Sequence, residues 1–259
     1  MQLIFYKYQG TGNDFILIDN RESKIKLSKE QVASLCHRRF GIGADGLMLL
    51  ELQKGFDFKM VYYNSDGNES SMCGNGGRCI TAFAEHLGII KNKAHFNAID
   101  GEHFSEIRDN LVNLKMKDVN TIEENGDHYF LNTGSPHYVK FVNEIESYDV
   151  FNEGRKIRMN ERFRNTGTNV NFIEKAGKEL FVRTYERGVE DETYSCGTGV
   201  TAAALVAALS GSASADDSCA ITTLGGKLNV RFKKKSAQHF TDIYLEGPAA
   251  FVFEGKISL

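Results

Sequence analysis

Apolar positions along the chain follow two spacings, one helical and one typical of strands. The segment 32–40, VASLCHRRF, has helical spacing; Ser28 and Gln31 ahead of it fit a capping box, and Gly41 marks its expected end. Short runs rich in β-branched and aromatic residues, bounded by turn residues, predict strands in hairpins. These runs are 46–52, 56–64, 170–175 and 180–186.

Two further segments, 79–88 and 200–211, are mostly apolar and end at Gly88 and Gly211, where a helix commonly ends. Segment 200–211 contains no charged residue, so a helix there must be covered on all sides. A strongly curved antiparallel sheet around a central helix meets this requirement. We therefore predict an α+β fold in which a barrel-like antiparallel sheet wraps around a helix.

The whole pattern occurs twice. Landmarks recur in the same order at offsets of 122 to 125: 11–13 with 133–135, 39–40 with 162–163, 63–64 with 185–186, 73–76 with 196–199, and Gly101 with Gly226. Coincidental glycine-rich turns in one large domain would not keep both order and offset. We predict two pseudo-symmetric domains that are copies of one unit, residues 1–118 and 119–259.

Composition narrows the classes of function. Hydrophobic residues make up 41% and charged residues 25%, as in ordinary globular proteins. With 31 basic and 34 acidic residues the net charge is −3, which gives no field to attract nucleic acid. The longest uncharged apolar run, 200–209, is far shorter than the roughly 20 residues that span a bilayer, so no membrane role is expected.

The start of the chain does not resemble a signal peptide, and we expect a cytoplasmic protein. In a reducing compartment its 5 cysteines are expected to be thiols. The sequence has no CxxC pair of the kind that holds structural zinc, so no metal site is predicted.

The strongest chemical signal is Cys-Gly-x-Gly at the expected start of a helix, present once in each half at Cys73 and Cys196. A helix N-terminus carries unpaired N–H groups and about half a positive charge, and glycine lets a ligand approach the backbone. Such a start binds a carboxylate or phosphate and favours the thiolate form of a neighbouring cysteine. We predict that these two cysteines are reactive and that Cys36, Cys79 and Cys219 belong to the core or are incidental.

Duplication gives the two cysteines a joint role. If the halves pack about a pseudo-two-fold axis, one sulfur can remove a proton from a stereocentre while the other returns a proton to the opposite face. A carboxylate held by the helix starts would stabilise the charge that develops on the α-carbon. The sequence therefore points to inversion of a small amino acid, with no pyridoxal-type or other cofactor implied.

Residues at corresponding positions, most of them polar, are candidates for binding this substrate. They are Asn13 with Ser135, Asn64 with Glu186 and Arg187, and Gly46 with Asn169. Glu186 and Arg187 together offer an acceptor for an ammonium group and a cation for a carboxylate. His137 is a candidate acid or base, although a single histidine is more often structural.

Six motifs in this order resemble the signature of the diaminopimelate epimerase family. They are TGNDF at 11–15, CGNGGRC at 73–79, GSPH at 134–137, TNV at 168–170, ERG at 186–188 and SCGTG at 195–199. The resemblance covers nearly the whole chain. It implies a cofactor-independent homodimeric epimerase that interconverts LL- and meso-2,6-diaminopimelate on the bacterial route to lysine and peptidoglycan.

The resemblance also implies roles for individual residues. The two catalytic cysteines of the family fall on Cys73 and Cys196. Its carboxylate-binding backbone falls on Gly74, Asn75, Gly197 and Thr198, and its substrate-contacting side chains on Asn13, Asn64, Asn169, Glu186 and Arg187. The chain departs from many members at Ser135, where Asn is common, and at Gly46, where some have Gln, while His137 matches a family histidine.

Three alternatives stay open at this point. A racemase of the proline-racemase type would carry His where this chain has Asn75. Isomerases related to phenazine biosynthesis share a similar fold but lack the paired cysteines. A small-molecule binding module without catalysis predicts that Cys73→Ala removes no chemical activity.

Overall fold

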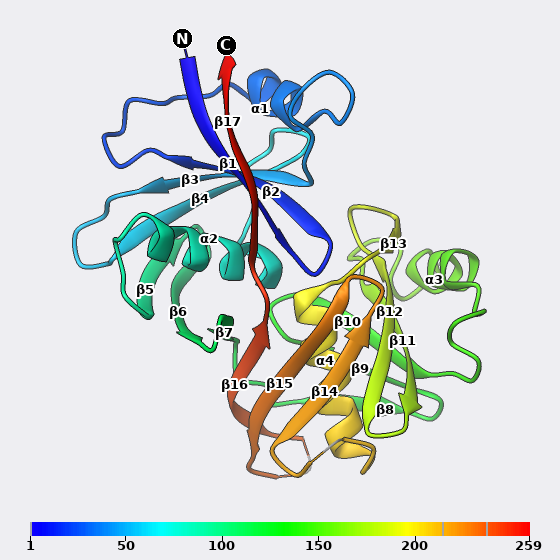
Figure 1. The fold of residues 1–259 in the computed structure, drawn as a ribbon. Helices are drawn as coiled ribbons and strands as arrows, with labels where there is room; N and C mark the ends of the chain where they lie inside the picture. The colour runs from blue at the N-terminus through cyan, green and yellow to red at the C-terminus, as the bar shows by residue number, and fades with distance from the viewer. Residues whose placement is uncertain (1, 214, 237) are drawn as a thin grey trace. The chain divides into compact units, whose positions relative to one another are not determined.

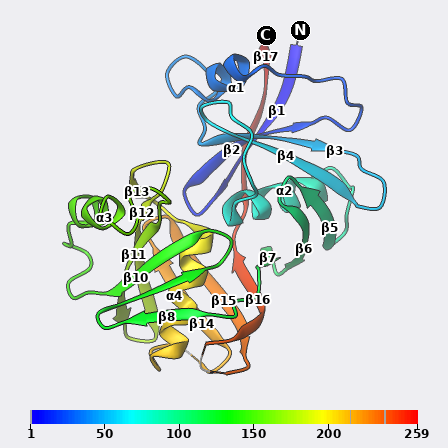
Figure 2. The ribbon, with the colours of Figure 1, turned by 180° about the vertical axis from the view of Figure 1, so that it is seen from behind.

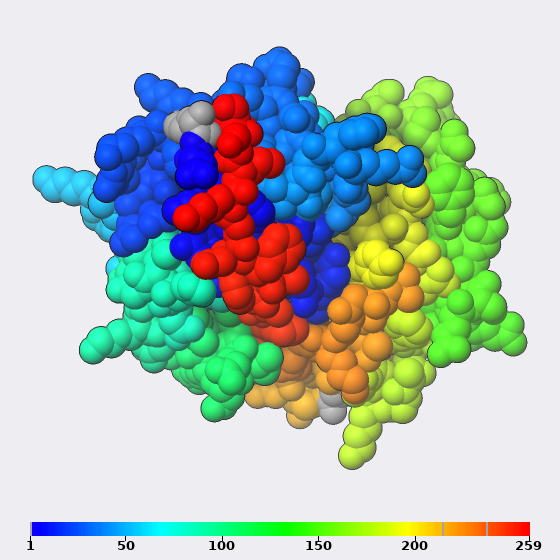
Figure 3. Space-filling model, turned by 45° about the horizontal axis from the view of Figure 1, so that its top comes forward, coloured from blue at the N-terminus to red at the C-terminus, as the bar shows by residue number. Residues whose placement is uncertain are grey.

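The computed structural model describes residues 2–213, 215–236 and 238–259, which form two compact units. Unit 1 contains the described residues up to Leu114 together with Pro248–Leu259, and unit 2 is Lys115–Gly247. The predicted second domain, 119–259, thus differs from the structure at its end. The reason is that β17 (Ala250–Ser258) pairs antiparallel with β1 (Gln2–Gly10), and the two strands run side by side (Figures 1 and 3).

Unit 1 is one sheet with two helices. In order of pairing its strands are β17, β1, β2 (Asn13–Asp19), β3 (Gly46–Glu51), β4 (Phe58–Asn64), β5 (Lys93–Ala98), β6 (Gly101–Arg108) and β7 (Leu111–Lys115). Its helices are α1 (Lys29–Cys36) and α2 (Gly74–His86). Helix α2 packs on β1, β2, β3, β6 and β17, so both ends of the chain contribute to its surroundings.

Unit 2 has the same arrangement. In order of pairing its strands are β8 (Ile122–Asn125), β9 (His128–Asn132), β10 (Pro136–Phe141), β11 (Asn169–Ala176), β12 (Glu179–Glu186), β14 (Ser218–Thr223), β15 (Gly226–Lys234) and β16 (Phe240–Gly247), with β13 (Asp191–Thr193) also on β12. Its helices are α3 (Val150–Arg158) and α4 (Gly197–Leu209). Helix α4 lies among the strands of its unit in both views (Figures 1 and 2).

The fold is mixed α+β, as predicted, with mostly strands and four helices in the described part. The predicted purely antiparallel sheets are wrong, because β2–β3, β4–β5, β10–β11 and β12–β14 are parallel pairs. Each of these pairs is separated in sequence by one helix. Parallel neighbours need such a crossover, whereas hairpins produce only antiparallel pairs.

The expectation of a fully covered helix is confirmed for α4. It contacts β9, β10, β11, β12, β14, β15 and β16, and the side chains from Val200 to Ala207 are buried. Both central helices stop at a glycine in the left-handed region, Gly88 with φ 70° and Gly211 with φ 74°. Neither helix can cross a membrane, and the same holds for the other helices of the described residues.

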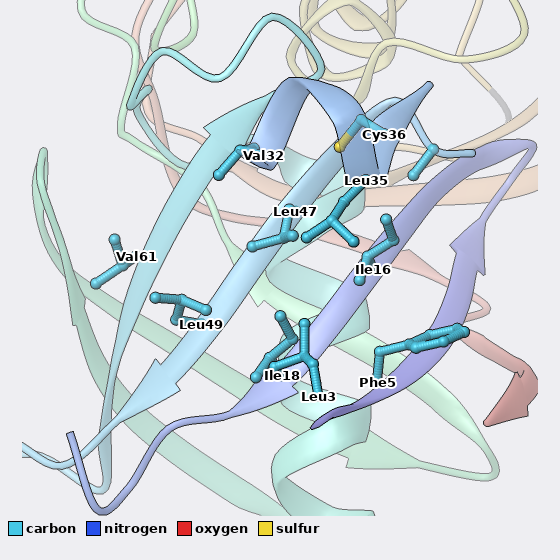
Figure 4. Close-up of a cluster of buried hydrophobic side chains, with 11 residues drawn as sticks. Leu3, Phe5, Ile16, Ile18, Val32, Leu35, Cys36, Leu47, Leu49 and Val61 are labelled. Carbon is cyan, nitrogen blue, oxygen red and sulfur yellow. The ribbon is translucent and has the colours of Figure 1, made fainter. Parts of the chain in front are cut away.

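The capping box at the start of α1 is confirmed, since Ser28 and Gln31 exchange side-chain and backbone hydrogen bonds. The helix ends at Cys36, earlier than the predicted stop at Gly41. The backbone leaves the helical path at His37, with ψ 121°, and the Nδ1 of His37 accepts hydrogen bonds from the backbone N–H groups of residues 39 and 40 in the turn that follows. The helix packs on a core of unit 1 formed by β1, β2, β3 and β4 (Figure 4).

Strand registers place the sequence landmarks at equivalent points of the two sheets. Facing Cα partners are Phe15–Gly46 and Met48–Tyr62 in unit 1, and His137–Asn169 and Asn171–Thr184 in unit 2. The sequence offset of 122 to 123 therefore also relates residues that occupy the same position of the sheet. Residues of one unit can be compared with their counterparts in the other on this basis.

Candidate active site

Cys73 is the N-cap residue of α2 in unit 1. Its backbone is extended, with φ −102° and ψ 150°, and its Sγ accepts a hydrogen bond from the Gly76 N–H at 3.1 Å. A Cβ on Gly76 would lie 3.1 Å from this sulfur, a tight contact that requires a small shift of the neighbouring atoms. The sulfur therefore sits at the positive end of the helix, half-buried, in direct contact with one of the backbone donors.

Cys196 holds the same position in unit 2, as the N-cap residue of α4. It is more buried than Cys73, with 7% of its surface exposed, and its Sγ lies 3.5 Å from Thr198 Oγ1. The Thr198 carbonyl accepts a hydrogen bond from Thr133 Oγ1 at 2.8 Å, which ties the first turn of α4 to the end of β9. Each predicted cysteine thus lies at the start of a largely buried helix.

The amide side chains predicted in unit 1 form a chain beside α2. Asn75 Nδ2 donates to Asn13 Oδ1 at 3.2 Å, and Asn13 Nδ2 donates to Asp45 Oδ2 at 2.7 Å. Asp45 also pairs with Arg38, at 2.6 Å. Asn13, the first residue of β2, is thereby held in one orientation with its amide next to the helix start.

A cluster of charged side chains lies next to these amides and includes Asp45, which accepts from Asn13. Asp14 is partly buried, which opposes its ionisation, but hydrogen bonds from Arg38 and Lys7 hold its pKa at about 2. Lys7 also donates to the carbonyl of Gly43. Sequence reasoning missed Arg38, Asp45 and Lys7, because each lies in a separate segment and only the fold brings them together.

Arg78 is the largest side chain among the fully buried ones and was also missed. Its guanidinium donates to Gly74 O at 3.2 Å, to Thr11 Oγ1 at 3.1 Å and to Pro248 O at 3.3 Å. Burial lowers its pKa to about 10. The signal in the sequence is an arginine that directly follows the glycines and precedes the apolar stretch of the helix. It ties the first turn of α2 to both ends of the chain.

Gly46 and Asn64 face each other at the ends of β3 and β4. A Cβ on Gly46 would lie 2.6 Å from the Tyr62 ring and 2.7 Å from Tyr63 O, so packing alone requires glycine there. Asn64 is exposed at the end of its strand. The structure thus gives Gly46 a packing reason that is independent of substrate.

Three predicted residues of unit 2, Ser135, Asn169 and Arg187, form one hydrogen-bonded group, and Glu186 bonds a neighbouring strand. Asn169 Nδ2 donates to Ser135 Oγ at 3.0 Å, and Asn169 Oδ1 accepts from the Arg187 backbone N–H at 2.9 Å. The Arg187 guanidinium also donates to Ser135 Oγ, at 3.3 Å. Glu186 accepts from Thr193 Oγ1 at 2.8 Å. The exposed guanidinium is oriented by this group.

His137 is fully buried on β10. Its Nδ1 lies 3.1 Å from Asn171 Nδ2. Burial, with a contribution from the positive charge of Arg187, lowers the pKa of His137 to about 3. The imidazole is therefore neutral at the pH of the cell.

The other three cysteines are buried in the core, as predicted: Cys36 is 2% exposed, and Cys79 and Cys219 are fully buried. Burial raises the pKa of both Cys36 and Cys79 to about 12, so these thiols stay protonated. In the described part of the chain, no group of three or more His, Cys, Asp or Glu side chains could hold a metal ion. Chemically, each unit offers a thiol next to backbone donors that suit a carboxylate.

Comparison with known proteins points to one family. The family model described as diaminopimelate epimerase matches residues 5–122 and 129–252. The diaminopimelate epimerase of Flavobacterium psychrophilum is 53% identical over 255 residues, covering 97% of this chain and 99% of that protein. The enzyme of the same name from Chlorobaculum tepidum is 43% identical, covering 96% and 99%.

Solved structures at low identity share the fold. A Bacillus anthracis protein of the PhzF family has a TM-score of 0.74 at 13% identity, with 100% of both chains covered. A hydroxyproline epimerase from Agrobacterium vitis has a TM-score of 0.72 at 13% identity, covering 100% of this chain and 93% of that one. These likenesses extend to the two rival groups considered above, so the fold by itself does not choose among them.

Proposed function

The chain belongs to the diaminopimelate epimerase family, and from this premise we propose that Cys73 and Cys196 invert one α-carbon of LL-2,6-diaminopimelate to give the meso isomer. The activity, an isomerisation in lysine biosynthesis, follows from family membership. The two-thiol route is supported by one observation above all. Each unit has a cysteine as the N-cap residue of a buried, glycine-rich helix start.

The reaction is a proton exchange between two sulfurs and one carbon. A thiolate removes the α-proton from one face, and the electron pair of the C–H bond delocalises into the α-carboxylate. The thiol on the opposite face then gives its proton to the carbon, which forms a new C–H bond with inverted configuration. The first sulfur ends protonated and the second ends as the thiolate, so charge and protons balance.

Stabilisation of the intermediate is assigned to the helix starts. Negative charge that develops on the α-carboxylate would be met by the backbone N–H groups of Gly74 and Asn75 in unit 1 and of Gly197 and Thr198 in unit 2. Orphan N–H groups and the helix dipole favour such an anion. Preorganised donors of this kind supply a large share of catalysis in reactions that generate an oxyanion.

The remaining predicted residues are assigned to substrate recognition. Diaminopimelate carries a second amino-acid group that does not react and must be held. The guanidinium of Arg187 suits its carboxylate, while the amide and carboxylate groups of Asn13, Asn64, Asn169 and Glu186 suit its ammonium and remaining oxygens. Ser135, whose Oγ already contacts Asn169 and Arg187, serves to orient those two.

Two further proposals concern assembly. We infer that the two units are pseudo-symmetric copies of one unit, because strand registers, helix starts and closing glycines correspond at a near-constant offset. A homodimer, expected from the resemblance, remains a prediction that sedimentation or light scattering tests. A single species of the monomer mass at working concentration would contradict it.

The function is tested by incubating the purified protein with LL-diaminopimelate in deuterium oxide without added cofactor. We expect deuterium at the α-carbon and accumulation of the meso isomer, read by NMR and by chiral chromatography. Proline and hydroxyproline in parallel reactions test the racemase alternative. Absence of both exchange and meso product, under conditions where the protein is folded, would rule out the proposed function.

A further inference from the structure

Three buried polar side chains in unit 2 are linked by hydrogen bonds near the start of α4. They are His137 on β10, Asn171 on β11 and Thr184 on β12, with 0%, 0% and 3% of their surfaces exposed. Thr184 Oγ1 donates to Asn171 Oδ1 at 3.0 Å, and Asn171 Nδ2 lies 3.1 Å from His137 Nδ1. Neither Asn171 nor Thr184 belongs to a motif of the predicted site.

The orientation of the Asn171 amide is fixed by its surroundings. Its Nδ2 lies 3.0 Å from the carbonyl oxygen of Tyr138, which can only accept a hydrogen bond. That end of the amide must therefore be the NH₂ group, and its second hydrogen points to His137 Nδ1. Because an N–H donor faces it, Nδ1 must carry a lone pair, and in a neutral ring the proton then lies on Nε2.

His137 Nε2 is buried and has no hydrogen-bond partner among the described residues. A buried N–H group without an acceptor is unfavourable and is uncommon in folded proteins. The chain from Thr184 through Asn171 therefore leaves a neutral donor with its hydrogen-bonding capacity unused. An acceptor that arrives with the substrate would use it.

The equivalent positions of unit 1 lack such a chain. They hold Phe15, Met48 and Tyr62, and the rings of Phe15 and Tyr62 pack edge to face at a centroid distance of 6.1 Å. The same sheet positions thus accept aromatic and apolar side chains in a folded unit. The polar chain of unit 2 is not a requirement of this fold, which favours a functional reason for it.

The helix start in unit 2 is shaped around Asn171. A Cβ on Gly199 would lie 2.3 Å from Asn171 Oδ1, a contact that no real side chain shows. At the equivalent Gly76 in unit 1 the nearest atom of Met48 would lie 3.4 Å away, an ordinary distance. The second glycine of the Cys-Gly-x-Gly motif in unit 2 therefore makes room for the amide that faces the histidine.

We propose that Asn171 is a positioning residue which, supported by Thr184, holds His137 as the Nε2–H tautomer, so that His137 acts in the reaction as a neutral hydrogen-bond donor and never as a base. This inference rests on the proposed function for its catalytic part. Its structural part, the position of one proton, stands independently of any activity.

The tautomer is measured on the purified full-length protein labelled with ¹⁵N-histidine. In a long-range ¹H–¹⁵N spectrum at neutral pH, we expect the His137 ring to show a protonated Nε2 and an unprotonated Nδ1, with the signals assigned by their absence in His137→Gln. An Nδ1-protonated ring in the wild-type protein would overturn the proposal.

Asn171→Asp is the sharpest variant, because it keeps the shape and replaces the donor by an acceptor. The new carboxylate would accept from Nδ1–H, which moves the proton from Nε2 and turns Nε2 into an acceptor. We expect the tautomer to switch and kcat to fall by about 10²-fold, as when one preorganised donor is lost. A switched tautomer with unchanged kcat would overturn the positioning role.

Two more variants keep the test decisive. Asn171→Met introduces the residue found at the equivalent position of unit 1 and avoids a buried carboxylate. This variant should fold, but its His137 should no longer be held in one tautomer and its kcat should fall. Thr184→Val is the matched control, because it breaks the same chain but leaves the NH₂ group facing His137. It should keep the Nε2–H tautomer and lose much less activity, and an equal loss in both variants would contradict the proposal. Wild-type turnover tests the proposed function separately.

Discussion

The first turns of α2 and α4 begin alike but differ in what packs beneath them. Both start at an N-cap cysteine followed by Gly-x-Gly. Beneath α2 lie the aromatic and thioether side chains of Phe15, Tyr62 and Met48, whereas the same positions beneath α4 hold a hydrogen-bonded His137, Asn171 and Thr184. The shared cysteine and glycines are the features to which we assign the proton transfers, and the hydrogen-bonded polar chain is a feature of unit 2 alone.

A second difference lies within the helices themselves. The guanidinium of Arg78 in α2 donates hydrogen bonds to three acceptors. Its counterpart in α4 is Thr201, whose hydroxyl donates to Gly197 O at 2.9 Å. Unit 1 must hold a C-terminal strand that returns from unit 2, and Arg78 contacts the residue just ahead of that strand, Pro248. Arg78 therefore links helix α2 to the C-terminal segment that completes the sheet of unit 1.

The largest effect is expected where the units are most alike. Cys73→Ala and Cys196→Ala should each reduce net epimerisation by at least about 10³-fold, because each removes the acid or base for one face. The rate of meso product formation from LL-diaminopimelate measures this. Cys219→Ala, a core substitution, is the matched control and should keep most activity. Full activity in either of the first two variants would refute the two-thiol assignment.

The next effect concerns a charge present only in unit 2. Arg187→Gln should lower kcat/KM by about 10²-fold, because a carboxylate of the substrate loses a charged partner. Arg187→Lys should recover part of the loss, since the charge remains but the forked donor does not. Steady-state kinetics checks both, with the exposed Arg164→Gln as control. Equal kcat/KM in all three variants would remove Arg187 from the site.

Substitutions at the equivalent positions Arg78 of α2 and Thr201 of α4 should lower the free energy of unfolding by different amounts. Arg78→Met is expected to lower the free energy of unfolding by about 3 kcal/mol, because two buried acceptors and the partly buried carbonyl of Pro248 lose their donor. Thr201→Val removes a single hydrogen bond and should cost about 1 kcal/mol. Urea denaturation of both variants measures the difference. Two equal losses would mean that Arg78 does not tie the ends of the chain to α2.

The last predicted effect is a pH dependence in unit 2. The pKa of His137 falls from 6.5 to about 3 on folding, so the stability present above pH 6.5 is lost as the pH falls toward 3. At pH 5 the loss should be about 2 kcal/mol. His137→Phe introduces the residue of the equivalent position in unit 1, Phe15. In this variant the free energy of unfolding should fall less between pH 6.5 and 5 than in the wild-type protein. An unchanged slope would contradict the burial of a neutral ring.

The sequence predicts the parts of this molecule that depend on local pattern. The capping box at Ser28, the closing glycines Gly88 and Gly211 and the core positions of the three remaining cysteines lie as predicted. Each of these depends on a few neighbouring residues. The helix starts at Cys73 and Cys196 were found for the same reason, and their repetition made them stand out.

What the sequence could not predict depends on distant segments. The parallel strand pairs and the return of β17 to unit 1 follow from crossover connections that no local pattern records. Asp45 reaches Asn13 across 32 positions and Asn171 reaches His137 across 34. Such supporting residues carry no motif of their own, because any strand position of the right register could hold them.

The central claim is that two sulfurs act on opposite faces of one carbon, and the isotope content of substrate and product at early times tests it most directly. With LL-diaminopimelate in deuterium oxide, at less than about one tenth of conversion, two bases place solvent deuterium in the meso product and leave the recovered LL isomer unlabelled, because the incoming and outgoing protons belong to different sulfurs. A product that retains the original proton, or labelled LL isomer before any product forms, would show that one group serves both faces and would contradict the account.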